Sequence, residues 1–273
     1  MAAEHKIIYV WQEIAPYLAV SDNAKLGRAL PQAMQQKKYE VRVFMPDFGE
    51  INERRNQLHE VIRLSGMSIV IGDSDHPLVV KVASMQPSRI QVYFIDNDDY
   101  FVKEDGDADA FGTNRADNDE RAIFFARGMM DTAKKLRWEP EVLSVSGWMN
   151  GLVPLYLKRV YNDGPSFRST RVVTHLLPGA TPASVSEEIF DKLKVEGVKP
   201  ADIKKLRELP LDADFFTKAS ILFSDAVVIQ GCEPSEAVAE FIKAREISVL
   251  TLADMETHGD EADAFYKSLM GKK

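Results

Sequence analysis

The chain has 273 residues, and its hydrophobic content of 45% is enough for one large α/β domain or two small ones. A formal net charge of −8 and a pI near 5.3 argue against a nucleic-acid-binding protein, which would carry a basic patch, and fit a soluble cytoplasmic protein. The single cysteine, Cys232, excludes an internal disulfide, and no apolar run approaches the ~20 residues of a membrane span. We therefore expect a cytoplasmic protein with neither nucleic acid nor a membrane as a partner.

Residues 6–52 have the pattern of one complete strand, loop, helix and strand. The apolar runs at residues 7–10 and 41–45 are typical of strands that are buried on both faces of a parallel sheet. Between them, one buried helical face is predicted by the spacing of Leu26, Ala29, Leu30, Ala33 and Met34. Such a unit is a right-handed βαβ crossover, so the loop at residues 12–22 lies at the carboxyl end of the first strand, where open α/β sheets bind ligands.

The same stretch, QEIAPYLAVSDNAKLGRALPQAMQQKKYEVRVFMPDFGEIN, resembles the opening of the glycogen and starch synthases, S-E-V-A-P-Y-x-K-T-G-G-L-A-D-V-x-G-A-L-P-K-A-L. The matched positions include Glu13, Ala15, Pro16, Tyr17, Ala29, Leu30, Pro31, Val41, Arg42, Val43, Met45 and Pro46. The resemblance implies a family 5 glycosyltransferase with the two-domain GT-B fold, which transfers glucose from ADP-glucose to an α-1,4-glucan. It also implies that Glu13 binds substrate.

The resemblance is interrupted at residues 19–25, where AVSDNAK replaces the family's K-T-G-G-L-A-D. The family's lysine offers a charge to a phosphate, and its glycines let backbone N–H groups approach the ligand. Both are missing here. Ser21 or Asp22 can instead serve as an ordinary N-cap for the helix, and Pro31 should kink it.

Three short strands are predicted next, at residues 69–71, 78–82 and 90–95, and their turn residues indicate a mixed or antiparallel edge of the sheet. His59 and His76 have no second ligand at metal-binding spacing, so we expect no metal site. Residues 96–118 are dense in Asp, Asn and Gly but do not fit a calcium loop. We expect a solvated loop that is mobile across residues 103–115.

The family resemblance resumes at Asp117 and Asn118, which open a D-N-x-x-R-F-like motif and a helix that either residue could cap. This match implies that both residues bind substrate. The buried face of the helix is predicted to contain Ile123, Phe124, Ala126, Met130 and Ala133.

A strand at residues 142–145 leads into SGWMNGLVP, which resembles the family's H-D-W-H-x-G-L-x-P. Trp148 is kept and implied to bind substrate, whereas Ser144, Ser146, Gly147 and Met149 stand where the family has histidines and an aspartate.

The strand at residues 171–174 runs into His175, which matches the histidine of the family's T-x-H-N and is implied to bind substrate. A packed, structural histidine is the alternative. Beyond it we predict a helical pair at residues 184–209 broken at Gly197 and Pro200, a helix at 215–223, a strand at 225–229, and two helices around residues 249–252. Cys232 has no partner of the kind that a reactive thiol needs, so it is predicted to be a packing residue.

The predicted fold is therefore α/β, a single Rossmann-like domain with a mostly parallel sheet flanked by helices, similar to the N-terminal half of a GT-B glycosyltransferase. By resemblance, residues 1–273 correspond to the N-terminal domain of a glycogen or starch synthase, and we expect the C-terminal nucleotide-binding domain to be absent. No cofactor is expected, and the sequence identifies no catalytic residue.

Two functional hypotheses follow. The chain transfers glucose from ADP-glucose to an α-glucan, or it is an inactive relative that binds a glucan, a sugar nucleotide or another protein. In two-domain GT-B enzymes one face of the N-terminal domain lines the cleft between the domains. Under the second hypothesis, we expect a homo-oligomer or protein partner on this cleft face, centred on Trp148, Met149, His175 and residues 17–23.

Overall fold

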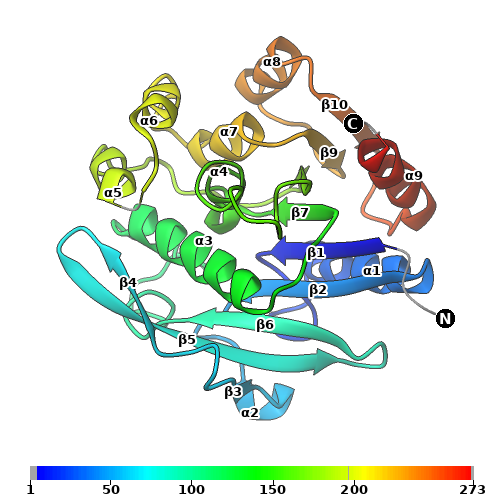
Figure 1. Ribbon diagram of the computed structural model, residues 1–273, viewed down its shortest axis with the longest axis horizontal. Coiled ribbons are helices and arrows are strands. Elements are labelled where there is room, and N and C mark those ends of the chain that lie inside the picture. Colours follow the sequence, from blue (N-terminus) through cyan, green and yellow to red (C-terminus); the bar gives the residue numbers. More distant parts are fainter. Residues whose placement is uncertain (1–4, 196, 272–273) are drawn as a thin grey trace.

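The computed structural model describes residues 5–195 and 197–271, and its strands form one sheet (Figure 1). The order across the sheet is β10-β9-β8-β7-β1-β2-β6-β5-β3, with β4 paired to β5. The strands are β1 His5–Trp11, β2 Tyr39–Pro46, β3 His59–Glu60, β4 Met67–Ile71, β5 Ser74–Met85, β6 Ile90–Asp96, β7 Val142–Ser146, β8 Arg171–Leu176, β9 Ala226–Gln230 and β10 Ser248–Leu252.

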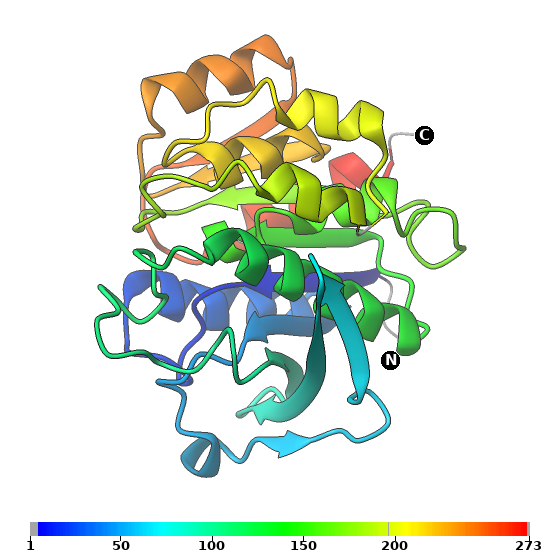
Figure 2. The same cartoon turned by 90° about the vertical axis from the view of Figure 1, so that its left-hand side faces the viewer.

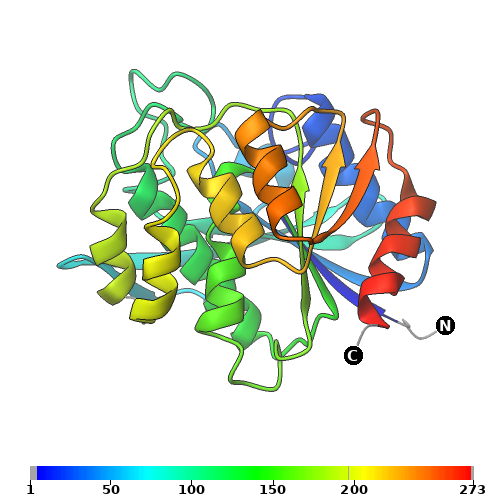
Figure 3. The same cartoon turned by 90° about the horizontal axis from the view of Figure 1, so that it is seen from above.

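The helices cover both faces of this sheet. They are α1 Asp22–Gln36, α2 Glu53–Asn56, α3 Asn118–Lys135, the 3₁₀ helix η1 Trp148–Asn150, α4 Val153–Arg159, α5 Ile189–Val195, α6 Pro200–Leu206, α7 Phe215–Leu222, α8 Glu236–Ala244 and α9 Gly259–Met270. Figure 3 shows α1 and α9 on one side of the sheet and α4, α7 and α8 on the other. None of the helices in the described residues combines the length and the hydrophobicity needed to cross a bilayer.

The strand pairing confirms the predicted mixed, mostly parallel sheet. β1 pairs in parallel with β2 on one side and with β7 on the other, and β5 pairs antiparallel with β6, β4 and β3. The earlier strands β2 and β6 lie on one side of β1 in the sheet. The later strands β7, β8, β9 and β10 follow one another on the other side. The order therefore reverses between β1 and β7, which is the position where open α/β sheets bind ligands.

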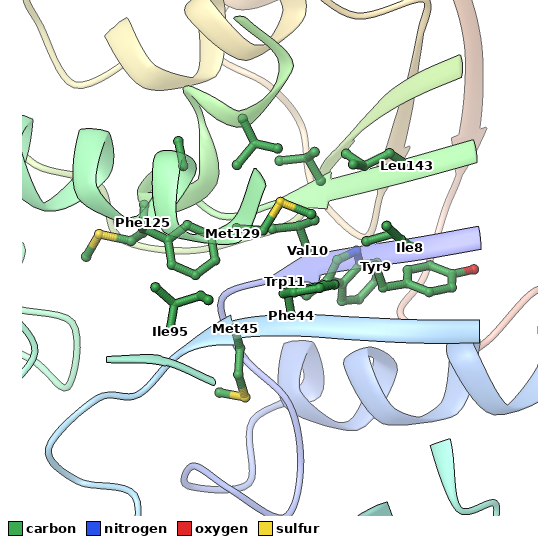
Figure 4. Packing of buried hydrophobic residues seen from close by; sticks show 14 of the residues in the cluster. Ile8, Tyr9, Val10, Trp11, Phe44, Met45, Ile95, Phe125, Met129 and Leu143 are labelled. Atoms are coloured by element: carbon green, nitrogen blue, oxygen red, sulfur yellow. The ribbon is translucent and has the colours of Figure 1, made fainter. Parts of the chain in front are cut away.

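The core is a continuous layer of apolar side chains between the sheet and its helices. In Figure 4, Phe125 and Met129 of α3 lie over the strands that carry Val10 and Phe44. All four side chains are almost completely buried. The predicted buried face of α3 is confirmed, and the burial of Phe125 and Met129 extends it around more of the helix, because α3 is enclosed between the sheet and the outer helices (Figure 2).

The acidic segment before α3 makes more hydrogen bonds and ion pairs than its composition predicted. Arg115 donates two hydrogen bonds of 2.7 Å to Asp107, and only 5% of the Arg115 side chain is exposed. Arg121, which is also buried, donates to the carbonyl oxygens of Tyr100 and Phe111 at 2.8 and 2.7 Å. Residues 102–106, 108, 114 and 116 are exposed, as predicted for a solvated loop. The composition did not predict that Arg115 and Arg121 bind carboxylate and carbonyl oxygens of the segment.

Two local predictions about helix ends have different outcomes. Ser21 caps α1 as predicted, since its hydroxyl accepts a hydrogen bond of 2.9 Å from the Ala24 amide. Asp117 occupies the N-cap position of α3, but its side chain makes no capping hydrogen bond, so the predicted cap is wrong in that respect. The helix α1 continues through Pro31.

Replacing Phe125 with Ala should lower the free energy of unfolding by about 3–5 kcal/mol, because the change leaves a cavity between α3 and the sheet. Chemical denaturation followed by circular dichroism measures this loss. Val20→Ala is the control, since Val20 is 72% exposed and its truncation should change the free energy by less than about 0.5 kcal/mol. Equal losses in the two variants would contradict this packing of α3.

Candidate functional site

A pocket of about 90 Å³ opens at the carboxyl ends of β1, β7 and β8, beside the position where the strand order reverses. It is small compared with the roughly 300–1,000 Å³ of sites that enclose a whole ligand. Its lining comprises Trp11, Gln12, Glu13, Asn23, Phe111, Val145, Ser146, Gly147, Trp148, Thr174, His175, Leu176, Leu177, Pro178, Gly179, Ala180, Thr181, Phe216, Thr217 and Ser220. The pocket can therefore hold one part of a larger ligand.

Glu13 is held in this lining by the first residues of α1. The Ser21 hydroxyl donates to one carboxylate oxygen at 2.7 Å, and the Asn23 amide donates to the other at 3.1 Å. The same Asn23 amide donates to the Pro178 carbonyl at 2.6 Å, which ties the loop after β8 to the first turn of α1. Ser21 thus does more than form the predicted N-cap, because together with Asn23 it orients a carboxylate.

Two buried side-chain amides fix the turn between β7 and η1. Asn150 donates to the carbonyl oxygens of Val10 at 3.1 Å and Ser146 at 2.6 Å, so it joins the carboxyl ends of β1 and β7. The Gln12 side-chain oxygen accepts from the Met149 amide at 3.1 Å. Gly147 has a φ of +94°, and a Cβ at this position would lie 2.5 Å from the Gln12 Cβ, so only glycine fits.

Sequence reasoning did not identify Gln12 or Asn150 as site residues. Neither residue belongs to the motif positions that carry the resemblance. The bond from Met149 to Gln12 and the bond from Asn150 to Val10 each join residues more than 130 positions apart in the chain. The one local signal was Gly147, whose place directly after a strand is typical of a backbone with positive φ.

His175 lies at the end of β8 and is buried, with 2% of the residue exposed. Its Nε2 is 2.9 Å from the Gln230 side-chain oxygen, and the Gln230 amide nitrogen donates to the Glu256 carbonyl at 2.5 Å. Burial lowers the pKa of His175 to about 4, so the ring is neutral near pH 7.

The orientation of Gln230 decides the tautomer of this neutral ring. Because the Gln230 nitrogen is used by the Glu256 carbonyl, its oxygen faces the ring, and Nε2 must carry the proton. Nδ1 of His175 is then an acceptor, and it has no hydrogen-bond partner among the described residues. The Trp11 ring packs edge-on against the imidazole, with 5.0 Å between ring centroids, and holds its plane.

Trp148 lines the pocket but is only 3% exposed. Its ring lies 5.6 Å from that of Phe216, and its Nε1 has no hydrogen-bond partner among the described residues. Met149 is completely buried. Trp148, Met149 and His175 therefore pack inward, and the prediction that they form an exposed contact surface on the cleft face was wrong. Ala19, Val20 and Asp22 are the exposed residues of the stretch at 17–23.

Asp117 and Asn118 are the two predicted binding residues that do not line the pocket. The Asn118 amide donates to the Gly112 carbonyl at 3.0 Å, and its oxygen accepts from Arg121 at 2.7 Å. Burial raises the pKa of Asp117. Asn118 holds the end of the loop that brings Phe111 into the pocket lining, whereas Glu13, Trp148 and His175 line the pocket directly.

The lining contains one carboxylate, Glu13, and neither Lys nor Arg from the described residues. No group of three or more His, Cys, Asp or Glu side chains in residues 5–195 and 197–271 is arranged to hold a metal ion. His59 is exposed, and His76 contacts the Tyr100 hydroxyl at 2.9 Å. Cys232 is half-buried, and burial raises the pKa of its thiol, which fits a packing residue.

Comparison with known proteins shows the family to which the chain is similar. Residues 6–236 match the model of the starch synthase catalytic domain. The chain is 31% identical over 245 residues to a glycogen synthase from Chlorobium luteolum and 32% identical over 235 residues to one from Chlorobium limicola. These matches cover 86% and 84% of this chain, but only 50% and 48% of the relatives. The chain thus spans about half the length of the curated relatives it matches.

A similar fold occurs in the catalytic domain of starch synthase IV from Arabidopsis thaliana, a structure that contains ADP and acarbose. The TM-score is 0.68 at 13% sequence identity, and the match covers 91% of this chain and 51% of the other. At this identity, the comparison supports the fold.

The buried, neutral state of His175 predicts a dependence of stability on pH. Between pH 6.5 and 4 the unfolded chain binds more protons at this residue than the folded chain, so stability falls with falling pH. The contribution of the neutral ring to the free energy of unfolding is fully present above pH 6.5. Near and below pH 4 the free energy of unfolding is lower by about 3 kcal/mol. His175→Gln should remove this component, as measured by denaturation curves across the range.

His59→Gln is the matched control for this measurement, because His59 is exposed. Its pH profile should follow that of the parent. If His175→Gln and the parent lost stability in parallel between pH 6.5 and 4, the neutral assignment of the buried ring would be contradicted.

Proposed function

The chain belongs to the family of starch synthase catalytic domains, and we propose that its pocket binds one glucosyl unit of an α-glucan or of ADP-glucose. The observation that carries this proposal is the polar lining of the pocket at the switch point of the sheet, which has one carboxylate and no Lys or Arg among the described residues. A sugar hydroxyl both donates and accepts hydrogen bonds, so it suits a site with unpaired groups of both kinds.

The unpaired groups in this lining are complementary to a hydroxyl-bearing ligand. Nδ1 of His175 is an acceptor and Nε1 of Trp148 is a donor, and neither atom has a partner among the described residues. Both atoms are buried, so a ligand hydroxyl reaches them only when the side chains that cover them shift. A buried polar group without a hydrogen bond costs about 1–3 kcal/mol, so a ligand that satisfied either one would recover part of that cost. Glu13 adds a carboxylate that Ser21 and Asn23 already orient.

The charge of the lining favours the sugar over the diphosphate as the group that enters the pocket. Cations normally neutralise bound phosphates, and the lining offers Glu13 but no Lys or Arg among the described residues. A phosphate would meet a carboxylate of like charge. In this proposal the diphosphate of ADP-glucose lies outside the pocket of about 90 Å³, and the glucosyl unit lies inside it.

Glucosyl transfer from ADP-glucose to an α-glucan is the second candidate function, and the names of the glycogen synthase relatives favour it. Transfer requires stabilisation of the charge that develops on the leaving diphosphate, and the loss of one such group typically costs ~10²–10³-fold in rate. Since the pocket lining supplies no cation, these groups would come from outside the pocket. Sugar binding by this chain needs no such group and is the activity that we propose first.

The proposed roles of the residues follow from their positions. Glu13, Trp148 and His175 contact the glucosyl unit. Asn118 acts indirectly, since it holds the loop that presents Phe111 to the pocket, and Asp117 occupies the N-cap position of α3.

Maltotriose and ADP-glucose should raise the melting temperature of the purified chain, whereas ADP should not. A ligand at a hundredfold excess over its Kd stabilises the folded chain by about 2.7 kcal/mol. His175→Gln should abolish the shift, because Gln does not reproduce the acceptor at Nδ1, and His59→Gln should keep it. The absence of a shift with both sugar ligands would refute the proposal, and equal shifts with ADP and ADP-glucose would show that the nucleotide is recognised instead.

A further inference from the structure

The residue that fixes the orientation of His175 lies outside the pocket. Gln230 is the last residue of β9, it is completely buried, and it does not belong to the pocket lining. Its side-chain oxygen is 2.9 Å from Nε2 of His175, and its side-chain nitrogen donates to the Glu256 carbonyl at 2.5 Å. The reverse orientation of the amide would set its oxygen against the carbonyl oxygen, and neither atom can donate. Both halves of the amide are therefore used, and only one of its two orientations satisfies them.

The imidazole ring lies between residues of β1 and β9. His175 pairs with Val228, and Gln230 is two residues further along β9, so the His175 and Gln230 side chains share one face of the sheet. The Trp11 ring contacts the imidazole from β1, on the other side of β8 in the strand order. Turning the ring over by 180° would place a carbon atom against the Gln230 oxygen and break the hydrogen bond. The ring is thus held in one orientation by its two neighbours.

The carbonyl that anchors Gln230 belongs to residues 253–258, the segment between β10 and α9. The Glu256 amide donates to a side-chain oxygen of Asp254 at 2.9 Å, and Nε2 of His258 is 2.6 Å from the same oxygen. A side chain that bonds the backbone two residues further on forms a compact turn. The direction of the Glu256 carbonyl is therefore set by contacts within this segment.

We propose that Gln230 is the positioning residue that sets the specificity of the pocket, because it makes Nδ1 of His175 an acceptor and so requires a ligand group that donates a hydrogen bond. A sugar hydroxyl meets this requirement, whereas an ionised carboxylate has no proton to donate. Nδ1 is covered in the structure, so the ligand meets it once the covering side chains shift. The proposal rests on the sugar-binding function of the pocket and names the residue that selects its ligand.

The same arrangement makes a segment beyond the family match part of the site. The match to the starch synthase catalytic domain ends at residue 236, and Glu256 lies 20 residues later. Its carbonyl fixes the Gln230 amide, and the amide fixes the proton on the His175 ring. The loop before α9 thus influences the choice of ligand without touching the ligand.

The tautomer of His175 is observed directly by NMR of the imidazole nitrogens in nitrogen-15-labelled protein near pH 7. In the parent chain, Nε2 should carry the proton and Nδ1 should not. Gln230→Met keeps a side chain of similar length but removes the acceptor, so part of the population should carry the proton on Nδ1. Gln36→Met is the matched control at an exposed position and should leave the signals unchanged. The signals that disappear in His175→Gln identify the ring.

Monofluorinated maltoses test the requirement for a donor, because fluorine in place of a hydroxyl removes the proton that is donated. Fluorination at one position should weaken binding to the parent chain about 2–10-fold, which is the effect of one hydrogen bond. The loss of affinity should be smaller in Gln230→Met. In Gln36→Met it should equal that of the parent.

The outcomes separate the role of Gln230 from the function of the pocket. A parent chain whose neutral His175 carries the proton on Nδ1 overturns the proposal, whether or not sugars bind. So does a Gln230→Met variant with the tautomer and the fluorine effect of the parent. A parent that binds maltose but tolerates fluorine at every position also overturns it, and leaves the sugar site intact. A parent that has the expected tautomer but does not bind maltose refutes the sugar site, and with it the role of Gln230 in specificity.

Discussion

The geometry of the pocket depends on hydrogen bonds from two buried amide side chains at the junction of β1 and β7. Asn150 joins the carbonyl oxygens at the ends of both strands, and Gln12 binds the backbone of η1. Each bond is worth only about 1 kcal/mol net, but a buried group deprived of its partner costs about 1–3 kcal/mol. The turn that carries Trp148 is therefore fixed by contacts that are costly to break, and Gly147 is the residue that lets the two strands approach this closely.

The charged groups near the pocket stabilise its surroundings and leave its lining nearly neutral. Burial lowers the pKa of Arg121 to about 10, so it remains protonated near pH 7, and backbone carbonyls satisfy it. Arg115, which lies in the segment before α3, binds Asp107 through two hydrogen bonds and lowers the pKa of that carboxyl to about 2. Both guanidinium groups are used to hold the loop. Phe111 is the residue that this loop contributes to the pocket, so the cations act on the site through an aromatic side chain.

Most of the fold could be predicted from the sequence, because strand hydrophobicity, helix periodicity and the Ser21 cap are local signals. Motif positions also identified Glu13, Trp148 and His175, which the fold brings together at one sheet edge. The direction of a side chain is not a local property. Trp148 and Met149 pack inward because α3 and α7 enclose them, and the role of Gln230 depends on a carbonyl 26 residues away. The contacts within the acidic segment before α3 were not predicted, because composition does not reveal that Arg115 and Arg121 bind its carboxylate and carbonyl oxygens.

The helix α7 connects the two surfaces that the structure distinguishes. Phe216 and Ser220 line the pocket, whereas Lys218 and Leu222 line a groove of about 490 Å³ between α6, α7 and α8. Any change that moves α7 at one of these surfaces therefore also moves residues of the other. Thermodynamic linkage requires this influence to be reciprocal, since binding energy can bias an equilibrium only by the difference in affinity for its two states.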